Sequence, residues 1–325
     1  MSQPIEVDEP GTSEYSTQGE QPRTSTEPEA RSDESRSIKS VAPAILENGR
    51  FYCNETYLMP CDDIEQTRLS ILYQTYLSLL DNQISLGLIP RSPKRILEIG
   101  TGLGDWAIAV AERFPNAAVI ATDISTALHP GAAPPNVTFE IDDAQDEWTY
   151  NEPFDFIHIR ELGGAFSDWG MIYGEVSKHL KIGGSVEIAD HGRVTLMNEP
   201  ENSYTSIFNG ALESAAEKAR RPLNMDHLKK PAFEAAHLTV TKSKTFDLPV
   251  GDWSEDPRKK LAGKMALIAV LEGLEAVGLR LLTKYQGWKE AEVREVIEKV
   301  KEEIMRPDVK AFIRVQFVVA RKMGI

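Results

Sequence analysis

Residues 95–123 read Arg95-Ile-Leu-Glu-Ile-Gly-Thr-Gly-Leu-Gly-Asp-Trp-Ala-Ile-Ala-Val-Ala-Glu-Arg-Phe-Pro-Asn-Ala-Ala-Val-Ile-Ala-Thr-Asp123, and this stretch predicts the fold. The apolar run that opens it is typical of a buried parallel strand. Gly100, Gly102 and Gly104 follow, and such glycines let the chain turn sharply and a ligand lie against bare backbone. Apolar residues at helical spacing then continue to Pro115, and a second apolar run closes the stretch. We therefore predict a strand, a glycine-rich turn, a helix and a second strand.

Two carboxylates frame the glycines, Glu98 on the first strand and Asp123 at the tip of the second. An acid at the second tip can accept hydrogen bonds from both hydroxyls of a ribose, so the unit is expected to bind a nucleoside-bearing cofactor. A dinucleotide fingerprint would have the spacing G-x-G-x-x-G, whereas this turn has G-x-G-x-G. The pattern Glu-x-Gly-x-Gly-x-Gly is similar to motif I of the class I methyltransferases that use S-adenosylmethionine (SAM). That similarity implies SAM as the cofactor, with the acid before the glycines close to its ammonium group.

The composition excludes several classes of partner. The chain of 325 residues has a formal net charge of −14 and a pI near 5.0, which argues against direct nucleic-acid binding and against an anionic membrane surface. Cys53 and Cys61 fit neither a zinc motif nor a redox pair, so we predict free thiols and no metal site. The sequence has no apolar run of membrane-spanning length and no signal-peptide core. We expect a protein of the cytoplasm, the nucleus or both that is not secreted.

The N-terminal part divides into a tail and the start of a folded domain. Residues 1–42 are rich in Ser, Thr, Glu, Pro and Gln, and we predict a disordered tail because such a segment cannot bury enough apolar surface to fold. Residues 43–325 are predicted to form one domain. Asp62 or Asp63 can cap a helix that runs to about residue 81 and could fold over the cofactor as a lid. Tyr57 and Arg68 could face the ligand, although core packing for Tyr57 and a surface salt bridge for Arg68 remain open.

Three further strands are predicted, and each ends on polar residues. The third, 137–141, ends on Asp142-Asp143-Ala144, whose acids could accept from the amine of an adenine or could instead cap the following turn. The fourth, 154–159, ends on Arg160-Glu161, and the fifth, 185–189, ends on Asp190-His191. Because ligands of open α/β sheets bind at the carboxyl ends of the strands, we expect these side chains to share one crevice.

The rest of the chain supplies a cap and a late pair of strands. Residues 193–237 are predicted to be helical and to cap the crevice, residues 238–248 alternate as an exposed strand does, and residues 311–320 form a last apolar strand. Two helices, 257–285 and 289–305, are predicted between these strands. We predict an α/β fold: a doubly wound, Rossmann-like class I methyltransferase sheet with an antiparallel C-terminal strand and helical cap insertions.

From about residue 45 onward the chain resembles the fungal LaeA-like methyltransferases. The segments that carry this resemblance are Phe139-Glu-Ile-Asp-Asp-Ala-Gln-Asp-Glu-Trp148, Phe154-Asp-Phe-Ile-His-Ile-Arg160 with Asp168-Trp169, Leu248-Pro-Val-Gly-Asp-Trp253 with Asp256-Pro257-Arg258, Leu271-Glu-Gly-Leu-Glu275 and Gly287-Trp288. The resemblance implies that residues 43–325 are a SAM-dependent methyltransferase domain that acts in fungal secondary metabolism. It also implies either a small-molecule acceptor, or a protein acceptor and a velvet-type protein partner, because some relatives are nuclear regulators and others methylate metabolites.

Two segments depart from the family pattern. The glycine turn of the family usually reads Asp-Leu-Gly-Cys-Gly-Thr-Gly-Ile-Trp, whereas here it reads Glu98-Ile-Gly-Thr-Gly-Leu-Gly-Asp-Trp106. The fifth strand lacks the family's Trp-x-Glu and reads Gly184-Ser-Val-Glu-Ile-Ala-Asp-His191. The glycines are kept, so we expect SAM binding to be kept, while the second departure lies next to the expected acceptor.

These patterns together define the predicted site. The predicted cofactor-binding residues are Tyr57, Glu98, Gly100, Thr101, Gly102, Gly104, Asp123, Ile124, Asp142, Asp143, Ala144 and Arg160. Glu161 and His191 are the predicted catalytic residues, because a base near the acceptor would help if the acceptor is a neutral hydroxyl. His158 lies in the middle of a strand and is expected to be a core histidine. Three functions stay open: a metabolite methyltransferase, a LaeA-like nuclear regulator, and a SAM-fold protein without methyl transfer.

Overall fold

The computed structural model describes residues 44–125, 132–198 and 202–324. The tail predicted at residues 1–42 lies outside the described residues. The strands in chain order are β1 (Ile45–Glu47), β2 (Arg50–Tyr52), β3 (Arg95–Ile99), β4 (Ala118–Asp123), β5 (Val137–Ile141), β6 (Phe154–Arg160), β7 (Leu180–His191), β8 (Thr195–Leu196), β9 (Leu238–Val250) and β10 (Ala311–Lys322). The helices are α1 (Asp63–Leu79), α2 (Asp105–Arg113), α3 (Trp169–His179), α4 (Tyr204–Ala219), the short 3₁₀ helix η2 (Asp226–Leu228), α5 (Lys230–Ala235), α6 (Pro257–Gln286) and α7 (Glu290–Ile304).

The main sheet has the order β5-β4-β3-β6-β7-β10-β8, and β9 also pairs with β10. The neighbouring strands β5, β4, β3, β6 and β7 pair in parallel, and β10 is antiparallel to β7, β8 and β9. The chain runs from β3 outward through β4 to β5 and then returns to β6 on the other side of β3. This reversal creates a crevice at the carboxyl ends of β3 and β6, where ligands of such sheets bind. The predicted doubly wound sheet with an antiparallel C-terminal strand is confirmed.

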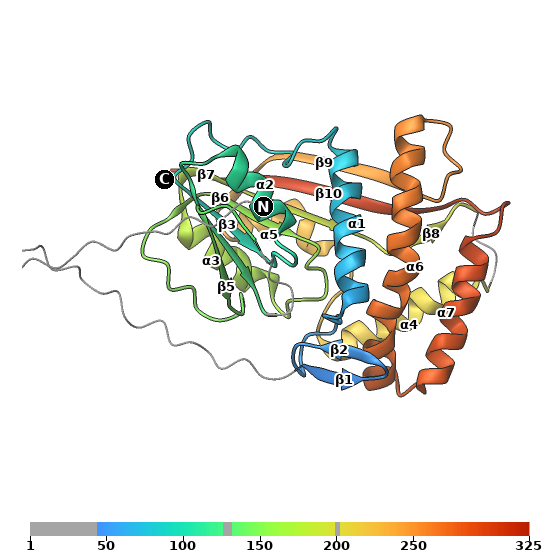
Figure 1. The fold of residues 1–325 in the computed structure, drawn as a ribbon. Coiled ribbons are helices and arrows are strands. Elements are labelled where there is room, and N and C mark those ends of the chain that lie inside the picture. Colours follow the sequence, from blue (N-terminus) through green and yellow to red (C-terminus); the bar gives the residue numbers. More distant parts are fainter. Residues whose placement is uncertain (1–43, 126–131, 199–201, 325) are drawn as a thin grey trace, which may run out of the picture. The chain divides into compact units, whose positions relative to one another are not determined.

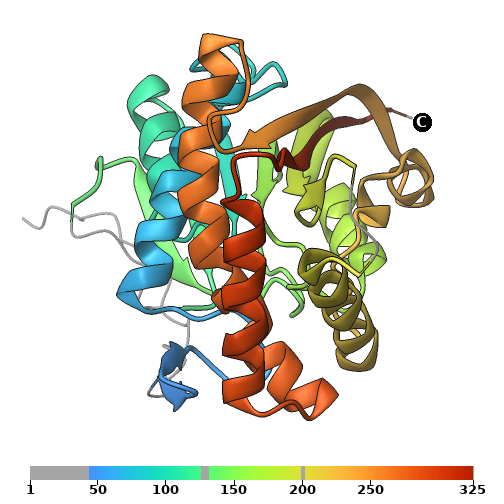
Figure 2. The ribbon, with the colours of Figure 1, turned by 90° about the vertical axis from the view of Figure 1, so that its right-hand side faces the viewer.

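Long helices stand beside this sheet (Figure 1). α1 packs against α6, and α6 packs in turn against α4, α7 and β9. Figure 2 shows α1 and α6 next to each other, with α7 alongside α6. A large apolar core joins these helices to β9 and β10, while smaller cores lie under α3 and under α2. No helix of the described segments is long and apolar enough to cross a membrane.

Several boundaries differ from the sequence expectation, and local contacts explain them. The start of α1 directly after Asp62 agrees with the expected cap, because the Asp62 carboxylate accepts the N–H of Glu65, whereas the helix ends at Leu79 instead of near residue 81. β7 starts at Leu180 instead of residue 185, because Leu180 pairs with Phe154 at the irregular start of the β6–β7 pairing, where a Cβ atom added at Gly184 would lie 3.1 Å from the Phe154 carbonyl oxygen. Residues 193–237, expected to be helical, include the short strand β8 because residues 195–196 pair with the start of β10.

The N-terminal hairpin was not predicted as strands. β1 and β2 pair antiparallel around Asn48 and Gly49, which both have positive φ angles, of 51° and 78°. Asn-Gly between two short strands is a strong signal of a tight hairpin turn, because both residues tolerate the left-handed backbone. This signal was present in the sequence.

The packing of α6 on β9 predicts an unusual effect of replacing a helix glycine. A Cβ atom added at Gly263 would lie 2.1 Å from the carbonyl oxygen of Gly251, whose own N–H bonds to the Gly263 carbonyl at 2.9 Å. We therefore expect Gly263→Ala to lower the free energy of unfolding by about 1–3 kcal/mol, as overpacking does, although alanine favours helices. Urea unfolding measures this change.

The matched control is Gly210→Ala in α4, where an added Cβ atom would meet nothing within 4 Å. This substitution should raise the free energy of unfolding by about 0.5–1 kcal/mol, because alanine loses less backbone freedom on folding. Equal effects of the two substitutions would contradict the packing argument.

Candidate active site

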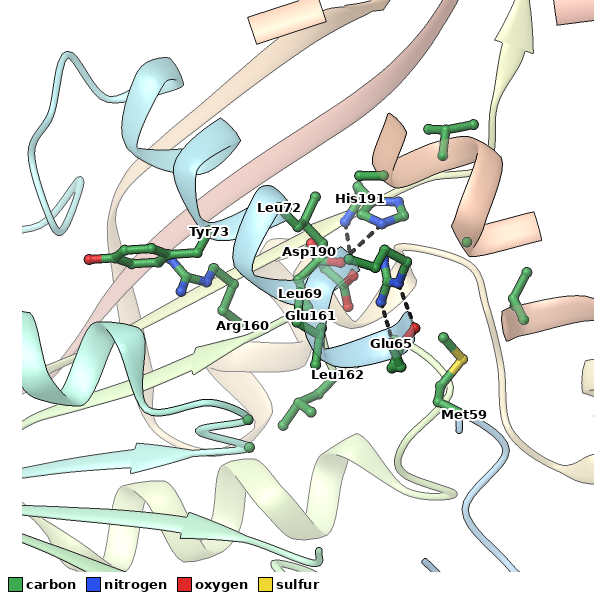
Figure 3. A pocket seen from close by; sticks show the side chains of 18 of the residues that line it. Met59, Glu65, Leu69, Leu72, Tyr73, Arg160, Glu161, Leu162, Asp190 and His191 are labelled. Carbon is green, nitrogen blue, oxygen red and sulfur yellow. Dashed lines mark hydrogen bonds and ion pairs between the residues drawn. The ribbon is translucent and has the colours of Figure 1, made fainter. Parts of the chain in front are cut away.

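Two adjoining cavities open at the carboxyl ends of the strands. The larger one has a volume of about 230 Å³ and lies between the sheet and helices α1, α4 and α6 (Figure 3). The smaller one, of about 50 Å³, lies at the ends of β4 and β5. Tyr57, Gly100, Asp123 and Leu162 line both cavities, so a single elongated ligand could occupy the two.

The glycine turn after β3 forms the floor between the cavities. Gly100 and Gly102 have φ angles of 69° and 55°, and a Cβ atom at Gly100 would lie 2.6 Å from the side chain of Leu162. Only glycine adopts this backbone easily, and here it also avoids a collision. Gly104 lines neither cavity. It has a left-handed backbone and is the N-cap residue of α2.

Asp123 joins this turn to the end of β4. Its carboxylate accepts the backbone N–H of Gly102 and of Ser125, each at 2.9 Å. Ile124, which follows Asp123, lines the smaller cavity together with Asp142, Asp143 and Ala144. Asp143 also accepts the N–H of Gln145 at 2.9 Å and so caps the turn after β5. Both roles left open for this pair of acids are therefore compatible with the geometry at Asp143.

Glu98 is a buried carboxylate at the larger cavity. The residue is 3% exposed, and its carboxylate accepts the Thr101 hydroxyl at 2.7 Å and lies 3.2 Å from Nδ1 of His158. Burial raises the pKa of Glu98 to about 8, and only part of this rise is offset by the Thr101 hydrogen bond and by Arg160. Burial and Arg160 lower the pKa of His158, which is stacked on Trp106 at 3.9 Å. His158 is therefore a neutral core histidine, and Glu98 would gain most from a cationic ligand group.

Residues of α1 extend the site across the crevice. The guanidinium group of Arg160 lies 5.0 Å from the ring centre of Tyr73 and 5.3 Å from that of Tyr76. Arg68 forms two hydrogen bonds with Glu65, at 2.7 and 2.8 Å, and these side chains are only 9% and 3% exposed. The surface salt bridge considered for Arg68 is thus wrong, because Glu65 and Arg68 both line the larger cavity.

Glu161 and His191 form an ion pair inside the larger cavity. Nε2 of His191 lies 3.0 Å from the Glu161 carboxylate, and Nδ1 lies 2.8 Å from the Gly192 carbonyl oxygen. Both neighbours can only accept hydrogen bonds, which favours an imidazolium that donates from both nitrogens. Burial by itself would lower the pKa of His191, but Glu161 raises it to about 9.

The backbone and a tyrosine hold Glu161 in place. Its φ angle is 59°, which is uncommon for a residue with a side chain, and its N–H bonds to the carbonyl of Ala189 at 3.0 Å. The hydroxyl of Tyr76 donates to the carboxylate. Burial raises the pKa of Glu161, while His191 opposes this rise. The carboxylate is thus desolvated and basic, and it points into the cavity (Figure 3).

Tyr76, Glu65 and His227 were not predicted as site residues from the sequence, whereas Asp190 was expected at the crevice. Glu65, Arg68, Leu72 and Tyr76 follow one another at spacings of three and four, which places them on one face of α1. That spacing was a sequence signal that could have identified Tyr76 and Glu65. Oδ2 of Asp190 lies 3.3 Å from Nε2 of His227, a pairing across 37 residues that no local pattern indicates.

The part of the larger cavity that α4 and α6 line is mostly apolar. Its walls are Phe208 and Leu212 of α4, next to the polar Asn209, and Ala266, Ala269, Val270, Gly273, Leu274 and Val277 of α6, while Leu69 and Leu72 of α1 add apolar surface closer to the glycine turn. The small residues of α6 make room there, because a larger side chain on that face would project into the cavity. Within the described residues, no group of three or more His, Cys, Asp or Glu side chains could hold a metal ion.

Comparison with known proteins agrees with this geometry. The sequence profile of a family described as "Methyltransferase domain" matches residues 73–245. Methyltransferase pytC of Aspergillus terreus is 33% identical over 271 residues, which cover 82% of this chain and 83% of that protein. The secondary metabolism regulator LAE1 of Cochliobolus heterostrophus is 30% identical, with coverage of 85% and 94%. The probable methyltransferase tdiE of Emericella nidulans is 28% identical, with coverage of 80% and 82%. The chain belongs to the LaeA-like family of SAM-dependent methyltransferases of fungal secondary metabolism.

Proposed function

We propose that this chain binds SAM across the two cavities and transfers its methyl group to a hydroxyl of a small, largely apolar molecule. The observation that carries the proposal is the division of the larger cavity. Polar residues at the strand ends, among them the Glu161–His191 pair, line one part of it next to the smaller cavity, and mostly apolar residues of α4 and α6 line the other part.

The residues at the strand ends match the chemical groups of SAM one by one. Asp123 would accept the ribose hydroxyls, and the smaller cavity, with Ile124, Asp142, Asp143 and Ala144, would hold the adenine. The bare backbone of the glycine turn and Thr101 would lie against the amino-acid end, whose ammonium group suits the buried carboxylate of Glu98. Tyr57 and Arg160 would close the two sides, and Gly104 would contribute through the start of α2.

The apolar part of the cavity favours a small acceptor over a protein. Apolar side chains from α1, α4 and α6 line it. Sites for small molecules are of this kind: mostly apolar, with a few placed polar groups. A flexible, polar peptide segment would have to desolvate its backbone to enter such a space.

Glu161 is the proposed base, and His191 holds it. When bound, SAM supplies an electrophilic methyl group to an acceptor oxygen placed in line with it. A neutral hydroxyl must lose its proton as the new bond forms, and the carboxylate of Glu161 has the accepting lone pairs for that proton. His191 and the Tyr76 hydroxyl orient the carboxylate, and burial raises its basicity.

A second candidate function is regulation in the nucleus together with a velvet-type protein partner. The similarity to the secondary metabolism regulator LAE1, which extends over 94% of that protein, supports it. Both functions can use the same methyl-transfer site. Co-purification of the tagged chain with a velvet-type protein from nuclear extract would favour regulation.

The cofactor assignment predicts a specific loss of affinity. Asp123→Asn should weaken SAM binding by about 1–3 kcal/mol, because the ribose hydroxyls would lose a charged acceptor. Isothermal titration calorimetry measures the change. The matched control is Asp226→Asn, which alters an exposed carboxylate outside both cavities and should leave the affinity unchanged. Equal affinities of Asp123→Asn and wild-type protein would refute the assignment.

The acceptor assignment predicts where a labelled methyl group goes. With methyl-labelled SAM and whole extract of the source organism, label should appear in the organic-solvent fraction and not on protein. Gly273→Leu should reduce this transfer by about tenfold or more, because misplacing the reacting atoms by about 1 Å can cost on the order of 100-fold. SAM affinity should stay within about twofold of wild type, since a Cβ atom added at Gly273 would meet only Arg68, and no residue of the glycine turn, within 4 Å.

The matched control for this variant is Gly210→Leu, the same change at a helix glycine with open space around it. It should leave both the transfer and the SAM affinity unchanged. Label on protein, or full transfer by Gly273→Leu, would contradict a small-molecule acceptor in this cavity.

The ion pair predicts the titration of His191. In the wild-type protein the His191 ring should titrate near pH 9, because Glu161 stabilises the imidazolium. In Glu161→Gln the ring should lose its proton at least about one pH unit lower, since one pKa unit corresponds to about 1.4 kcal/mol of lost interaction. Histidine ring signals in NMR titrations report both values. An unshifted titration in Glu161→Gln would show that the two groups do not interact.

A further inference from the structure

Residues 45–62 form a segment that we call the strap. It comprises the β1–β2 hairpin and the connection from the hairpin to α1. Thr56, Tyr57, Met59, Pro60 and Cys61 of the strap line the cavities, and Tyr57 lines both. The strap therefore forms part of the wall against which SAM would lie in the proposed function.

Polar contacts fasten most of the strap. Nε and Nη2 of Arg50 bind the carboxylate of Asp62 at 2.6 and 2.8 Å and so close the strap on itself. Lys284 donates to the Glu55 carbonyl at 2.9 Å, and Arg294 donates to the Asn48 carbonyl at 2.9 Å. Tyr52, Leu58 and Cys61 of the strap are buried as well, and Leu58 belongs to the large apolar core, so the polar contacts fix the strap together with these apolar anchors.

Arg280 of α6 is the most buried of these fastenings. It has an exposed fraction of 0%, and its Nη1 donates to the carbonyls of Asn54 and Tyr57 at 2.6 and 2.9 Å. Its Nε and Nη2 lie 2.9 and 2.7 Å from the Glu47 carboxylate. The guanidinium group is stacked over the ring of Tyr52, 3.6 Å from its centre. One side chain thus holds both the hairpin and the two ends of the loop that precedes the cavity wall.

Helix α6 connects this fastening to the active site. Its residues from Ala266 to Val277 line the apolar part of the larger cavity, and Arg280 follows within one turn of Val277. Figure 1 shows the β1–β2 hairpin beside the C-terminal end of α6, the end near which Arg280 lies in the sequence. The cavity wall on α6 and the strap therefore share one rigid element.

We propose that Arg280 is a positioning residue for SAM binding: it fixes the strap, and through the strap Tyr57, in the conformation that closes the cofactor cavity. This inference rests on the proposed function, because it takes SAM to be the ligand at that wall. Arg280 does not line either cavity and acts through the carbonyls of Asn54 and Tyr57. If fewer molecules have the strap in the closed conformation, the measured affinity for SAM falls in proportion to the fraction of molecules that remain closed.

The test compares SAM binding by wild-type protein and Arg280→Lys. Lysine keeps the positive charge but cannot reach the carbonyls and Glu47 together, because an ammonium group lacks the planar fork of a guanidinium. We expect the dissociation constant for SAM to rise by about tenfold or more, as it would if the closed conformation fell to about a tenth of the molecules. Calorimetry measures this constant.

Hydrogen–deuterium exchange separates positioning from general loss of structure. In Arg280→Lys the amides of residues 45–62 should exchange faster, while those of β10 should keep their wild-type protection. In wild-type protein SAM should slow exchange in the strap. Arg280→Lys with wild-type SAM affinity and wild-type β10 protection would overturn the proposal.

A second variant tests the role of the strap in SAM binding if Arg280→Lys does not fold. Lys284→Met removes the hydrogen bond to the Glu55 carbonyl and the ion pair with the Glu55 carboxylate, both made by a partly exposed side chain. Its matched control is Lys299→Met, which makes the same change in α7 at an ion pair with Glu302 that does not involve the strap. SAM binding weaker in Lys284→Met than in Lys299→Met would support the strap, and equal binding would overturn it. Failure of wild-type protein to bind SAM would instead overturn the proposed function.

Discussion

The hydrogen bonds that Asp123 accepts from the backbone of Gly102 and Ser125 join two strand ends, and the arrangement of the site depends on them. They hold the turn after β3 in a left-handed backbone that Gly100 and Gly102 adopt without strain. Leu162, at the end of β6, fills the space where a side chain on Gly100 would lie. The ends of β3, β4 and β6 are thereby locked together, and both cavities open over this junction.

The second constraint is the burial of charge at the cavity walls. A chain with a net charge of −14 places several carboxylates in its interior, and each is compensated in a different way. Glu65 is paired with the guanidinium of Arg68, and Glu161 with the imidazolium of His191. Glu98 accepts the Thr101 hydroxyl, and burial raises its pKa, which favours the neutral form. Unpaired buried charges would cost several kcal/mol each, so these partners are what allows a polar site under long apolar helices. The same logic applies to Arg280, which is buried but has Glu47 and two carbonyls as partners.

Much of the fold and of the site was predictable, because local patterns specify it. Buried parallel strands followed by polar residues are visible as sequence, and the topology of such sheets brings their carboxyl ends together. For this reason Glu161 and His191 could be named, although their chain positions are 30 residues apart. The hairpin at Asn48-Gly49 was also visible and was overlooked. The role of Arg68 was not visible, because an i, i+3 pair with Glu65 looks the same on a solvent-facing and on a cavity-facing side of a helix.

The sequence by itself determined the doubly wound sheet, the glycine turn with its acids, and the family. These features depend on the periodicity of apolar residues and on backbone conformations that few residue types adopt. Only the tertiary structure decided which side chains meet: Tyr76 with Glu161, His227 with Asp190, and Arg280 with the strap. The physical reason is that each of these contacts joins elements 37 to 226 residues apart, and their geometry is set by how helices pack on the sheet. No pattern within a single segment encodes that packing.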